Sequence, residues 1–374
     1  MQKEISYERY QRQMILPGFG EHAQGQLADA SVLVIGAGGL GCPVLQYLVA
    51  AGVGRIGIAD GDSVSLSNLH RQVLFHTSDI GKNKAETAAD RLRRLNPEIV
   101  IQPIAENVSS RNLLEIISAF DIVVDGTDNF ATRYMINDAC VLMNKVLVYA
   151  AVSRFEGQVA IFNYPTAQAG RSSNYRDLFP EPPGENEILN CADAGVIGVL
   201  PGIIGSMQAN EVIKVITGMG ELLVNQLLTF NAMTNQLYTV KITAKQETAQ
   251  LIPQTAAAFE KTDYAWLCAS PSTVNEIDAR TFNNLVQKGN IDIVDVRELH
   301  EMPAVDEFQH YRIPLAELKT AYLQLKNDTV VVFCQSGKRS LLAMKFLSEQ
   351  LGTTKRIHSL QGGIIAWKTF CQTK

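Results

Sequence analysis

The 374-residue sequence has little of what marks several classes of protein. Its 33 basic residues are outnumbered by 38 acidic ones, so no broad basic surface favours nucleic-acid binding. No apolar run is long enough to cross a bilayer, and the polar N-terminus lacks the apolar core of a signal peptide. The six cysteines include no C-x-x-C pair, which disfavours a disulfide scaffold. We therefore expect a cytoplasmic protein that binds neither nucleic acid nor membrane.

What is present favours two globular domains. The length exceeds that of one ordinary domain, and 46% of the residues are hydrophobic, enough to bury full cores. Short β-branched runs alternate with helical periodicity through the first two-thirds, which predicts a doubly wound, Rossmann-like parallel sheet. After a stretch rich in Ala, Thr, Gln and Lys the alternation restarts. We expect an α/β domain over 1–242, a linker over 243–273 and a small α/β domain over 274–374.

The first strand-helix-strand unit carries a glycine-rich turn. A strand at 31–35 ends at Gly-Ala-Gly-Gly-Leu-Gly (36–41), and the next strand, at 55–59, ends at Asp60. Glycines let backbone N–H groups approach a phosphate at a helix N-terminus, and a carboxylate after the second strand accepts hydrogen bonds from ribose hydroxyls. This pattern by itself indicates only a nucleotide, and NAD is its ordinary ligand.

Three charged residues farther along favour a triphosphate. Arg71 and Lys84 are cations placed after the ribose-binding strand. Asp128, in Gly-Thr-Asp-Asn at 126–129, follows a buried strand, and a carboxylate there near phosphates suits Mg²⁺. Each of these residues, taken alone, could equally be a solvent-exposed charged side chain of a loop.

Five motifs in order resemble the MoeB/ThiF family of ubiquitin-activating-like adenylyltransferases: RYQRQ, GAGGLG, ADGDSVSLSNLHRQ, GKNKAE and DGTDN. The resemblance extends from about residue 7 to about residue 241. It implies ATP and Mg²⁺ in place of NAD, and adenylation of the C-terminal glycine of a ubiquitin-like sulfur-carrier protein ending in Gly-Gly. It also implies a homodimer in which Arg12 reaches into the partner's ATP site.

The same resemblance assigns the ATP-site residues. They are Gly36, Gly38, Gly39, Gly41, Asp60, Asn68, Arg71, Gln72, Lys84, Asp128 and Asn129, with Asp128 as the Mg²⁺ ligand. Similar activating enzymes serve molybdopterin (molybdenum cofactor), thiamine and tRNA thiolation pathways, so the resemblance leaves the carrier open.

Cys191 follows a long stretch without periodicity, 166–190, rich in Pro, Gly, Asn and Glu. In family members fused to a sulfurtransferase, an equivalent cysteine is proposed to attack the adenylate or to link covalently to the carrier. A reactive thiol beside a mobile loop fits that role, and a buried structural cysteine is the alternative.

The sequence departs from its relatives at a zinc site. Many members bind structural zinc through two C-x-x-C pairs; here the first would fall at 174–177, which holds no cysteine, and near 265–270 only Cys268 remains. Tetrahedral zinc needs four good ligands, so we expect none. We expect Tyr264 and Trp266 to anchor the tail of the first domain by packing.

Cys334 marks the second domain. It lies between a strand at 329–333 and a helix at 340–349, where backbone N–H groups and the helix dipole stabilise a thiolate or a bound anion. A phosphatase-type cysteine loop uses the same physics and is the close rival.

Two further motifs, DVRE (295–298) and LQGGIIAW (360–367), resemble rhodanese-domain signatures over about 273–370. The resemblance implies that Cys334 carries a persulfide, supplied by a donor such as a cysteine desulfurase, and that Arg339 shapes its loop. The stretch between DVRE and the Ile-Pro-Leu segment differs from the usual rhodanese pattern. This difference affects the expected docking of the sulfur donor more than the chemistry at Cys334.

The leading hypothesis is therefore an adenylyltransferase fused to a sulfurtransferase, which converts the carrier's C-terminus to a thiocarboxylate. An NAD-dependent oxidoreductase and a scaffold presenting a redox-sensing cysteine are the alternatives.

Overall fold

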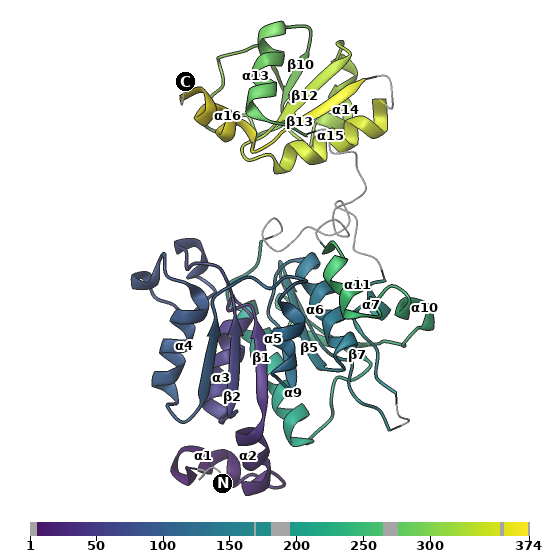
Figure 1. Cartoon of the computed structure of the whole chain (residues 1–374). Helices are drawn as coiled ribbons and strands as arrows, with labels where there is room; N and C mark the ends of the chain where they lie inside the picture. The colour runs from purple at the N-terminus through teal and green to yellow at the C-terminus, as the bar shows by residue number, and fades with distance from the viewer. Residues whose placement is uncertain (1–5, 168–169, 181–194, 265–275, 352–354, 373–374) are drawn as a thin grey trace. The chain divides into compact units, whose positions relative to one another are not determined.

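The computed structural model describes residues 6–167, 170–180, 195–264, 276–351 and 355–372. The chain divides into two compact units, Met1–Cys268 and Ala269–Lys374 (Figure 1). Across the described residues, no helix combines the length and the apolar character needed to span a bilayer.

One eight-stranded sheet forms the centre of the first unit, in the order β3-β2-β1-β4-β5-β6-β7-β8. The strands are β1 (Ser31–Ile35), β2 (Arg55–Ala59), β3 (Val100–Ile104), β4 (Ile122–Asp125), β5 (Val146–Ser153), β6 (Glu156–Phe162), β7 (Gln226–Asn231) and β8 (Gln236–Lys241). The first five strands in the spatial order are parallel, whereas β6, β7 and β8 are joined antiparallel. The predicted doubly wound α/β class is confirmed.

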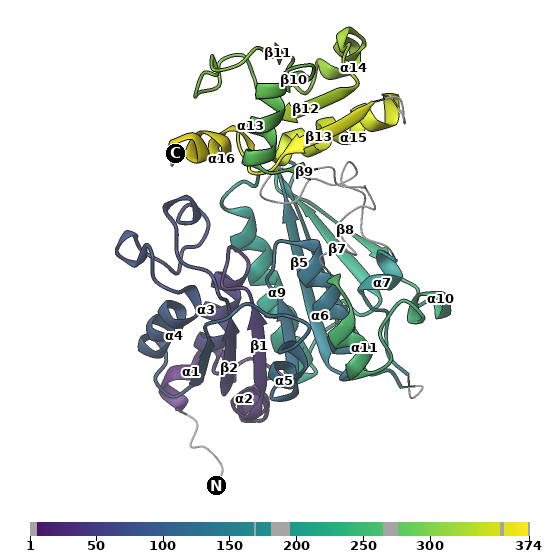
Figure 2. The same ribbon diagram turned by 45° about the horizontal axis from the view of Figure 1, so that its top comes forward.

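Helices cover both faces of this sheet (Figure 2). They are α1 (Tyr7–Met14), α2 (Gly20–Asp29), α3 (Gly41–Ala51), α4 (Lys84–Leu95), α5 (Leu113–Ser118), α6 (Phe130–Leu142), α7 (Tyr175–Leu178), α9 (Leu200–Thr217), α10 (Gln246–Ala249) and α11 (Ala256–Lys261), with 3₁₀ turns η1 (Leu66–Asn68) and η2 (Thr77–Asp79). Along β1, Val32 and Val34 pack with α3, α4 and α9, while Leu33 and Ile35 pack with α5, α6 and α11. Because successive strand residues point to opposite faces, a strand buried on both sides reads as a continuous apolar run.

The strand order creates a crevice at the carboxyl ends of β1 and β4. The chain proceeds from β1 outward to β2 and β3, then returns to the other side of β1 with β4. Helices that follow β1 and β4 therefore leave on opposite faces, and a ligand can lie between the two turns. The glycine-rich turn and the Gly-Thr-Asp-Asn turn meet at this point.

The region expected to be a linker begins with folded structure. Helices α10 and α11 lie within 243–273 and pack against α7 and α6. Tyr264 is buried there as expected, in ring contact with Phe259, and its hydroxyl donates to Asp138 Oδ2 at 3.0 Å. Trp266, the other expected anchor, lies outside the described residues. The boundaries at 242 and 273 stay predictions.

The segment expected to bear the first zinc pair is held by other contacts. Arg176 donates to both oxygens of Asp138 at 2.8 and 2.7 Å. Asp177 accepts a hydrogen bond from the backbone N–H of Lys245 at 2.9 Å and another from the Thr248 hydroxyl. These polar contacts connect the short helix α7, which interrupts the stretch predicted to lack periodicity, with α6 and α10.

The second unit has a five-stranded sheet in the order β11-β10-β12-β13-β9, all parallel. Its strands are β9 (Glu276–Ile277), β10 (Asp292–Asp295), β11 (Tyr311–Arg312), β12 (Thr329–Phe333) and β13 (Arg356–Leu360). Its helices are α13 (Ala279–Lys288), α14 (Leu318–Ala321), η3 (Tyr322–Gln324), α15 (Lys338–Leu351) and α16 (Gly363–Gln372). Strands β10 and β12 are neighbours, so the segments that follow them meet at one edge of the sheet.

Candidate functional site

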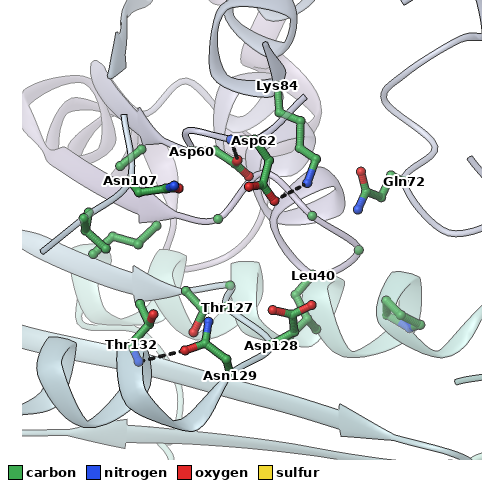
Figure 3. A pocket seen from close by; sticks show the side chains of 18 of the residues that line it. Leu40, Asp60, Asp62, Gln72, Lys84, Asn107, Thr127, Asp128, Asn129 and Thr132 are labelled. Carbon is green, nitrogen blue, oxygen red and sulfur yellow. Dashed lines mark hydrogen bonds and ion pairs between the residues drawn. The ribbon is translucent and has the colours of Figure 1, made fainter. Parts of the chain in front are cut away.

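A cavity of about 410 Å³ opens at the crevice between β1 and β4 of the first unit, within the size range of small-molecule sites (Figure 3). It is lined by Ile35, Gly36, Gly38, Gly39, Leu40, Ala59, Asp60, Asp62, Arg71, Gln72, Lys84, Glu106, Asn107, Val108, Gly126, Thr127, Asp128, Asn129, Thr132, Val152, Val196 and Pro201. Cationic side chains, carboxylates and glycine backbone therefore line the same cavity.

Glycine is required where the two turns touch. Gly36 has φ +92°, and a Cβ added there would lie 2.8 Å from the carbonyl oxygen of Gly126. A Cβ on Gly41 would lie 1.9 Å from the carbonyl oxygen of Gly36. The turns after β1 and β4 thus pack backbone against backbone, which leaves main-chain N–H groups available to a phosphate at the start of α3.

The carboxylate of Asp60 connects the glycine turn to the loop after β2. Its Oδ2 accepts a hydrogen bond from the N–H of Ala37 at 2.8 Å. Its Oδ1 accepts one from the N–H of Asp62 at 2.9 Å (Figure 3). Burial raises the pKa of the Asp60 carboxyl, and nearby Lys84 opposes that rise. Asp60 is held in one orientation with lone pairs left for a ligand.

Lys84 forms an ion pair at the cavity wall with an exposed carboxylate. Its Nζ lies 3.0 Å from Asp62 Oδ2, although the Lys84 side chain is only 8% exposed and that of Asp62 is 66% exposed. A cation buried to this degree needs an anion, and a solvated carboxylate is easily exchanged for another. A ligand phosphate can therefore take the place of Asp62.

The turn after β2 presents Arg71 and Gln72. The carbonyl of Asn68 accepts hydrogen bonds from the N–H groups of both residues, at 3.1 and 2.9 Å, and the Asn68 side chain accepts one from Ser65 N–H at 3.2 Å. Gln72 is 3% exposed, and its Oε1 has no hydrogen-bond partner among the described residues. A buried acceptor at the cavity wall is ready for a ligand donor or a water.

On the β4 side, a buried ion pair supports the turn that carries Asp128. Asp125 Oδ1 accepts hydrogen bonds from the N–H and hydroxyl of Thr127, at 2.9 and 2.6 Å. Asp125 Oδ2 lies 3.4 Å from Nε of Arg133, and both side chains are buried. Burial raises the pKa of Asp125, and Arg133 opposes that rise. Asn129 caps α6 through the N–H of Thr132 at 2.9 Å, which fixes the far end of the turn.

Most of the residues predicted for this site are brought together. Of that set, the cavity is lined by Gly36, Gly38, Gly39, Asp60, Arg71, Gln72, Lys84, Asp128 and Asn129. Gly41 and Asn68 lie outside the lining that the described residues form and act on it through the backbone contacts above. Cys191 falls outside the described residues.

Arg12 is placed away from the cavity of its own chain. It lies in α1, which docks at the end of α4: Arg9 donates to the carbonyl of Leu95 at 3.1 Å, and Asn96 Nδ2 donates to the Tyr10 hydroxyl at 2.8 Å. Lys84, at the other end of α4, lines the cavity. The 12 residues of α4 are about 18 Å long, so α1 is attached at the opposite edge of the sheet.

Several lining residues were missed by sequence reasoning. Glu106, Asn107 and Val108 follow β3, Val152 is the last residue but one of β5, and Val196 precedes α9. The first group had an available signal, because carboxyl ends of adjacent parallel strands share one edge. Val196 had none: the N–H of Arg154 donates to the carbonyl of Gly195 and that of Ile197 to the carbonyl of Arg154, contacts more than 40 residues apart.

Cys334 begins the loop between β12 and α15 in the second unit. It is 1% exposed, and its Sγ lies 3.8 Å from the hydroxyl oxygen of Ser340. The Ser340 hydroxyl donates to the carbonyl of Gly337 at 2.9 Å, and Gly337 has φ +95°. The loop therefore closes on the sulfur, with the N-terminus of α15 beneath it.

Two known protein families match this sequence, one in each unit. The ThiF family matches residues 10–251, and the Rhodanese-like domain matches residues 278–370. The chain belongs to the ThiF family. Its ThiF and rhodanese regions correspond to the two sheets and to the two sites just described.

Two relatives match almost the whole chain, and a third matches 60% of it. The chain is 38% identical to "Probable adenylyltransferase/sulfurtransferase MoeZ" of Mycobacterium tuberculosis, over 96% of this chain and 92% of that protein. It is 37% identical to "Adenylyltransferase and sulfurtransferase MOCS3" of Xenopus laevis, over 96% and 85%. It is 51% identical to "Sulfur carrier protein adenylyltransferase" of Thermus thermophilus, over 60% of this chain and 83% of the relative.

Among solved structures, E. coli MccB with AMPCPP and MccA has a TM-score of 0.56 at 24% identity, covering 65% of this chain and 73% of that chain. This likeness supports the fold of the ThiF region. Within the part of the chain that is described, no three or more His, Cys, Asp and Glu side chains group as a metal site. The expectation of no zinc stays a prediction.

Proposed function

We propose that the ThiF region adenylates the C-terminal glycine of a ubiquitin-like sulfur-carrier protein with ATP, and that the rhodanese region supplies sulfur to the activated carboxyl group. The observation that carries the proposal is the convergence of Asp60, Lys84 and Asp128 on one cavity at the switch point of the sheet. A relative that is 51% identical over 226 residues is named "Sulfur carrier protein adenylyltransferase", which supports the same activity.

The cavity suits the adenylation step. One oxygen of the carrier carboxylate forms a bond to the α-phosphorus of ATP, the bond from that phosphorus to the bridging oxygen breaks, and pyrophosphate leaves. Lys84 and Arg71 would hold the anionic phosphates against the anionic carboxylate, and Asp60 would hold the ribose. Positioning and charge stabilisation suffice, so no proton needs to be transferred.

Asp128 fits a Mg²⁺ site. Its carboxylate lines the same cavity as Lys84 and Arg71, and oxygen is the ligand type that Mg²⁺ prefers together with substrate phosphates. Bound there, Mg²⁺ would supply charge neutralisation for the phosphates. The Asp125–Arg133 pair would keep the Asp128 turn in place.

Arg12 would act in a second copy of the chain. Because α1 is attached at the edge of the sheet opposite the cavity, Arg12 can serve an ATP site only across a homodimer interface. This placement supports the homodimer that the family resemblance implies.

Sulfur transfer would follow at Cys334. A Cys334 persulfide sulfur attacks the acyl carbon of the adenylate, AMP leaves, and the carrier is joined to Cys334 through an acyl disulfide. A thiolate then attacks the Cys334 sulfur of that bond and releases the thiocarboxylate, with a disulfide left on the enzyme. Cys191, five residues before the cavity-lining Val196, is the thiol we assign to this step.

Two variants separate the two activities. Asp128→Ala should abolish carrier-dependent ATP–pyrophosphate exchange and leave thiosulfate sulfurtransfer intact, while Cys334→Ala should do the reverse. If Asp128→Ala removed both activities in a folded protein, the division of labour would be wrong. If Cys334→Ala kept sulfurtransfer, the persulfide would belong elsewhere.

A further inference from the structure

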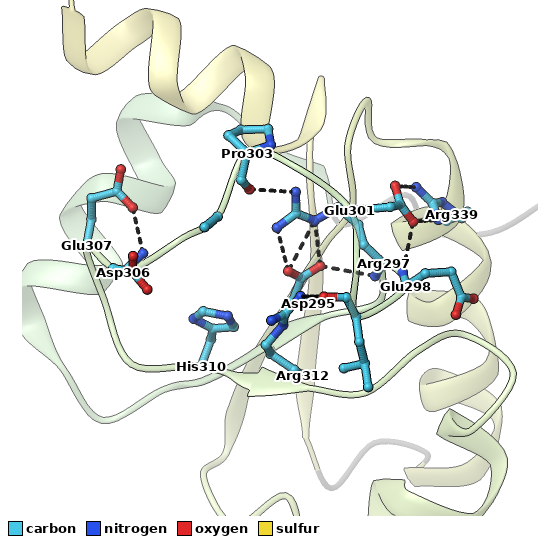
Figure 4. Close-up of polar contacts among 12 residues, drawn as sticks. Asp295, Arg297, Glu298, Glu301, Pro303, Asp306, Glu307, His310, Arg312 and Arg339 are labelled. Atoms are coloured by element: carbon cyan, nitrogen blue, oxygen red, sulfur yellow. Dashed lines mark hydrogen bonds and ion pairs between the residues drawn. The ribbon is translucent and has the colours of Figure 1, made fainter.

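Helix α15, which follows the Cys334 loop of the second unit, carries in its first turn a guanidinium that is paired with a carboxylate. Nη1 of Arg339 lies 2.5 Å from Oε1 of Glu301, and Nη2 of Arg339 lies 2.6 Å from Oε2 of Glu301 (Figure 4). This bidentate geometry is the strongest form of an arginine–carboxylate contact. The two side chains are partly exposed, at 35% and 21%, so the pair faces the solvent from which a sulfur donor must arrive.

Arg339 belongs to the surroundings of the reacting sulfur. It lies in the first turn of α15, directly after the loop that begins at Cys334, and the hydroxyl oxygen of its sequence neighbour Ser340 is 3.8 Å from Cys334 Sγ. Glu301 raises the pKa of the Arg339 guanidinium, and the Cys334 sulfur contributes to the same rise. The guanidinium is thus a cation that an anionic donor would meet near Cys334.

Glu301 is held in position by the loop after β10. Its Oε1 accepts a hydrogen bond from the N–H of Glu298 at 2.8 Å, and its own N–H donates to the carbonyl of Glu298 at 3.0 Å. The buried Arg297 side chain forms an ion pair with Asp295 and donates a hydrogen bond to the carbonyl of Pro303 at 3.0 Å (Figure 4). Anchored on both sides, the loop keeps the Glu301 carboxylate against Arg339, five residues after Cys334.

We propose that Glu301 is a specificity-determining positioning residue, which rests on the proposed role of Cys334 in sulfur transfer. By engaging Arg339, it disfavours doubly charged sulfur donors such as thiosulfate and favours persulfides of lower charge. A dianion must displace the Glu301 carboxylate from the guanidinium and approach that like charge. A persulfide carries less negative charge, so it can reach Cys334 while the Glu301–Arg339 ion pair stays formed.

Both transfers give the same enzyme product. The Cys334 thiolate attacks the outer sulfur of thiosulfate, the S–S bond breaks, and sulfite leaves with the electron pair. With a persulfide R–S–S⁻, the thiolate attacks the terminal sulfur and R–S⁻ leaves. In each case Cys334–S–S⁻ forms with no net oxidation, so the donors differ in charge and leaving group.

The experiment compares Glu301→Gln with wild type in the full chain, with thiosulfate or cysteine persulfide as donor and cyanide as acceptor. Glu298→Gln is the matched control, because it removes the same charge from an exposed side chain of the same loop. Glu301→Asp keeps the charge. Cys334→Ala sets the background: if it matches wild type, the proposed function fails before the role of Glu301 is in question.

We expect Glu301→Gln to raise kcat/KM for thiosulfate about tenfold, mainly through KM, with the value for cysteine persulfide changed by less than about threefold. Glu298→Gln and Glu301→Asp should stay within about threefold of wild type with both donors. Equal loss with both donors would show that Glu301 merely supports the loop and would overturn the proposal. The proposal would also be overturned if the ratio of kcat/KM for thiosulfate to kcat/KM for cysteine persulfide were the same in Glu301→Gln as in wild type.

Discussion

Substitution of Gly36 by Ala tests the contact between the two phosphate-side turns. Gly36 has φ +92°, and the new Cβ would lie 2.8 Å from the carbonyl oxygen of Gly126, where ordinary contacts begin at 3.4 Å. The turn that carries Asp128 must then move by about half an ångström. A misplacement of about 1 Å in a catalytic constellation costs about 100-fold in rate, so we expect kcat/KM for ATP to fall between about tenfold and 100-fold.

Gly218→Ala is the matched control for backbone strain. Gly218 also has positive φ, +67°, at the C-cap of α9, but a Cβ there meets nothing within 4 Å. Both variants should lose about 1–2 kcal/mol of stability from the left-handed conformation. Thermal unfolding measures that loss, and ATP–pyrophosphate exchange measures activity. If Gly36→Ala exchanged ATP as fast as Gly218→Ala, the close packing of the two turns would have no part in the site.

Three further predictions concern the tail, the second unit and metal content. Tyr264→Phe removes one hydrogen bond to buried Asp138 and should lower stability by about 1–2 kcal/mol in thermal unfolding; no change would show that this contact contributes nothing. Arg339 lowers the pKa of Glu301 from 4.5 to about 2, so the stability from this pair is present above pH 4.5 and is lost as pH falls toward 2. The free energy of unfolding of Glu301→Gln should lack this pH-dependent loss between pH 4.5 and 2. Identical acid-unfolding curves for the variant and wild type would contradict the ion pair. Elemental analysis should find no stoichiometric zinc, whereas one ion per chain would contradict the expectation.

Much of the ATP-type site could be predicted from sequence because its geometry is local. The turn at 36–41 needs only a strand, a glycine run and a helix, and Asp60 and Asp128 each directly or closely follow a buried strand. Parallel strands bring such positions to one edge whatever the details of packing. The same reasoning placed Cys334 between β12 and α15.

The features that sequence reasoning missed depend on contacts between distant segments. The docking of α1 rests on Asn96 and Tyr10, which are 86 residues apart, and the Glu301–Arg339 pair spans 38 residues. Neither contact follows from periodicity or motif spacing. The placement of α10 and α11 within the predicted linker was missed for a related reason, because these helices pack on α7 and α6, and their own sequence does not reveal that contact.

The central claim is carrier-dependent adenylation, and ATP–pyrophosphate exchange with candidate carriers ending in Gly-Gly tests it most directly. We predict exchange that requires one carrier, is lost when its terminal glycine is removed, and is absent in Asp128→Ala. Exchange without any carrier, or none with any carrier in folded protein that binds ATP, would contradict the account.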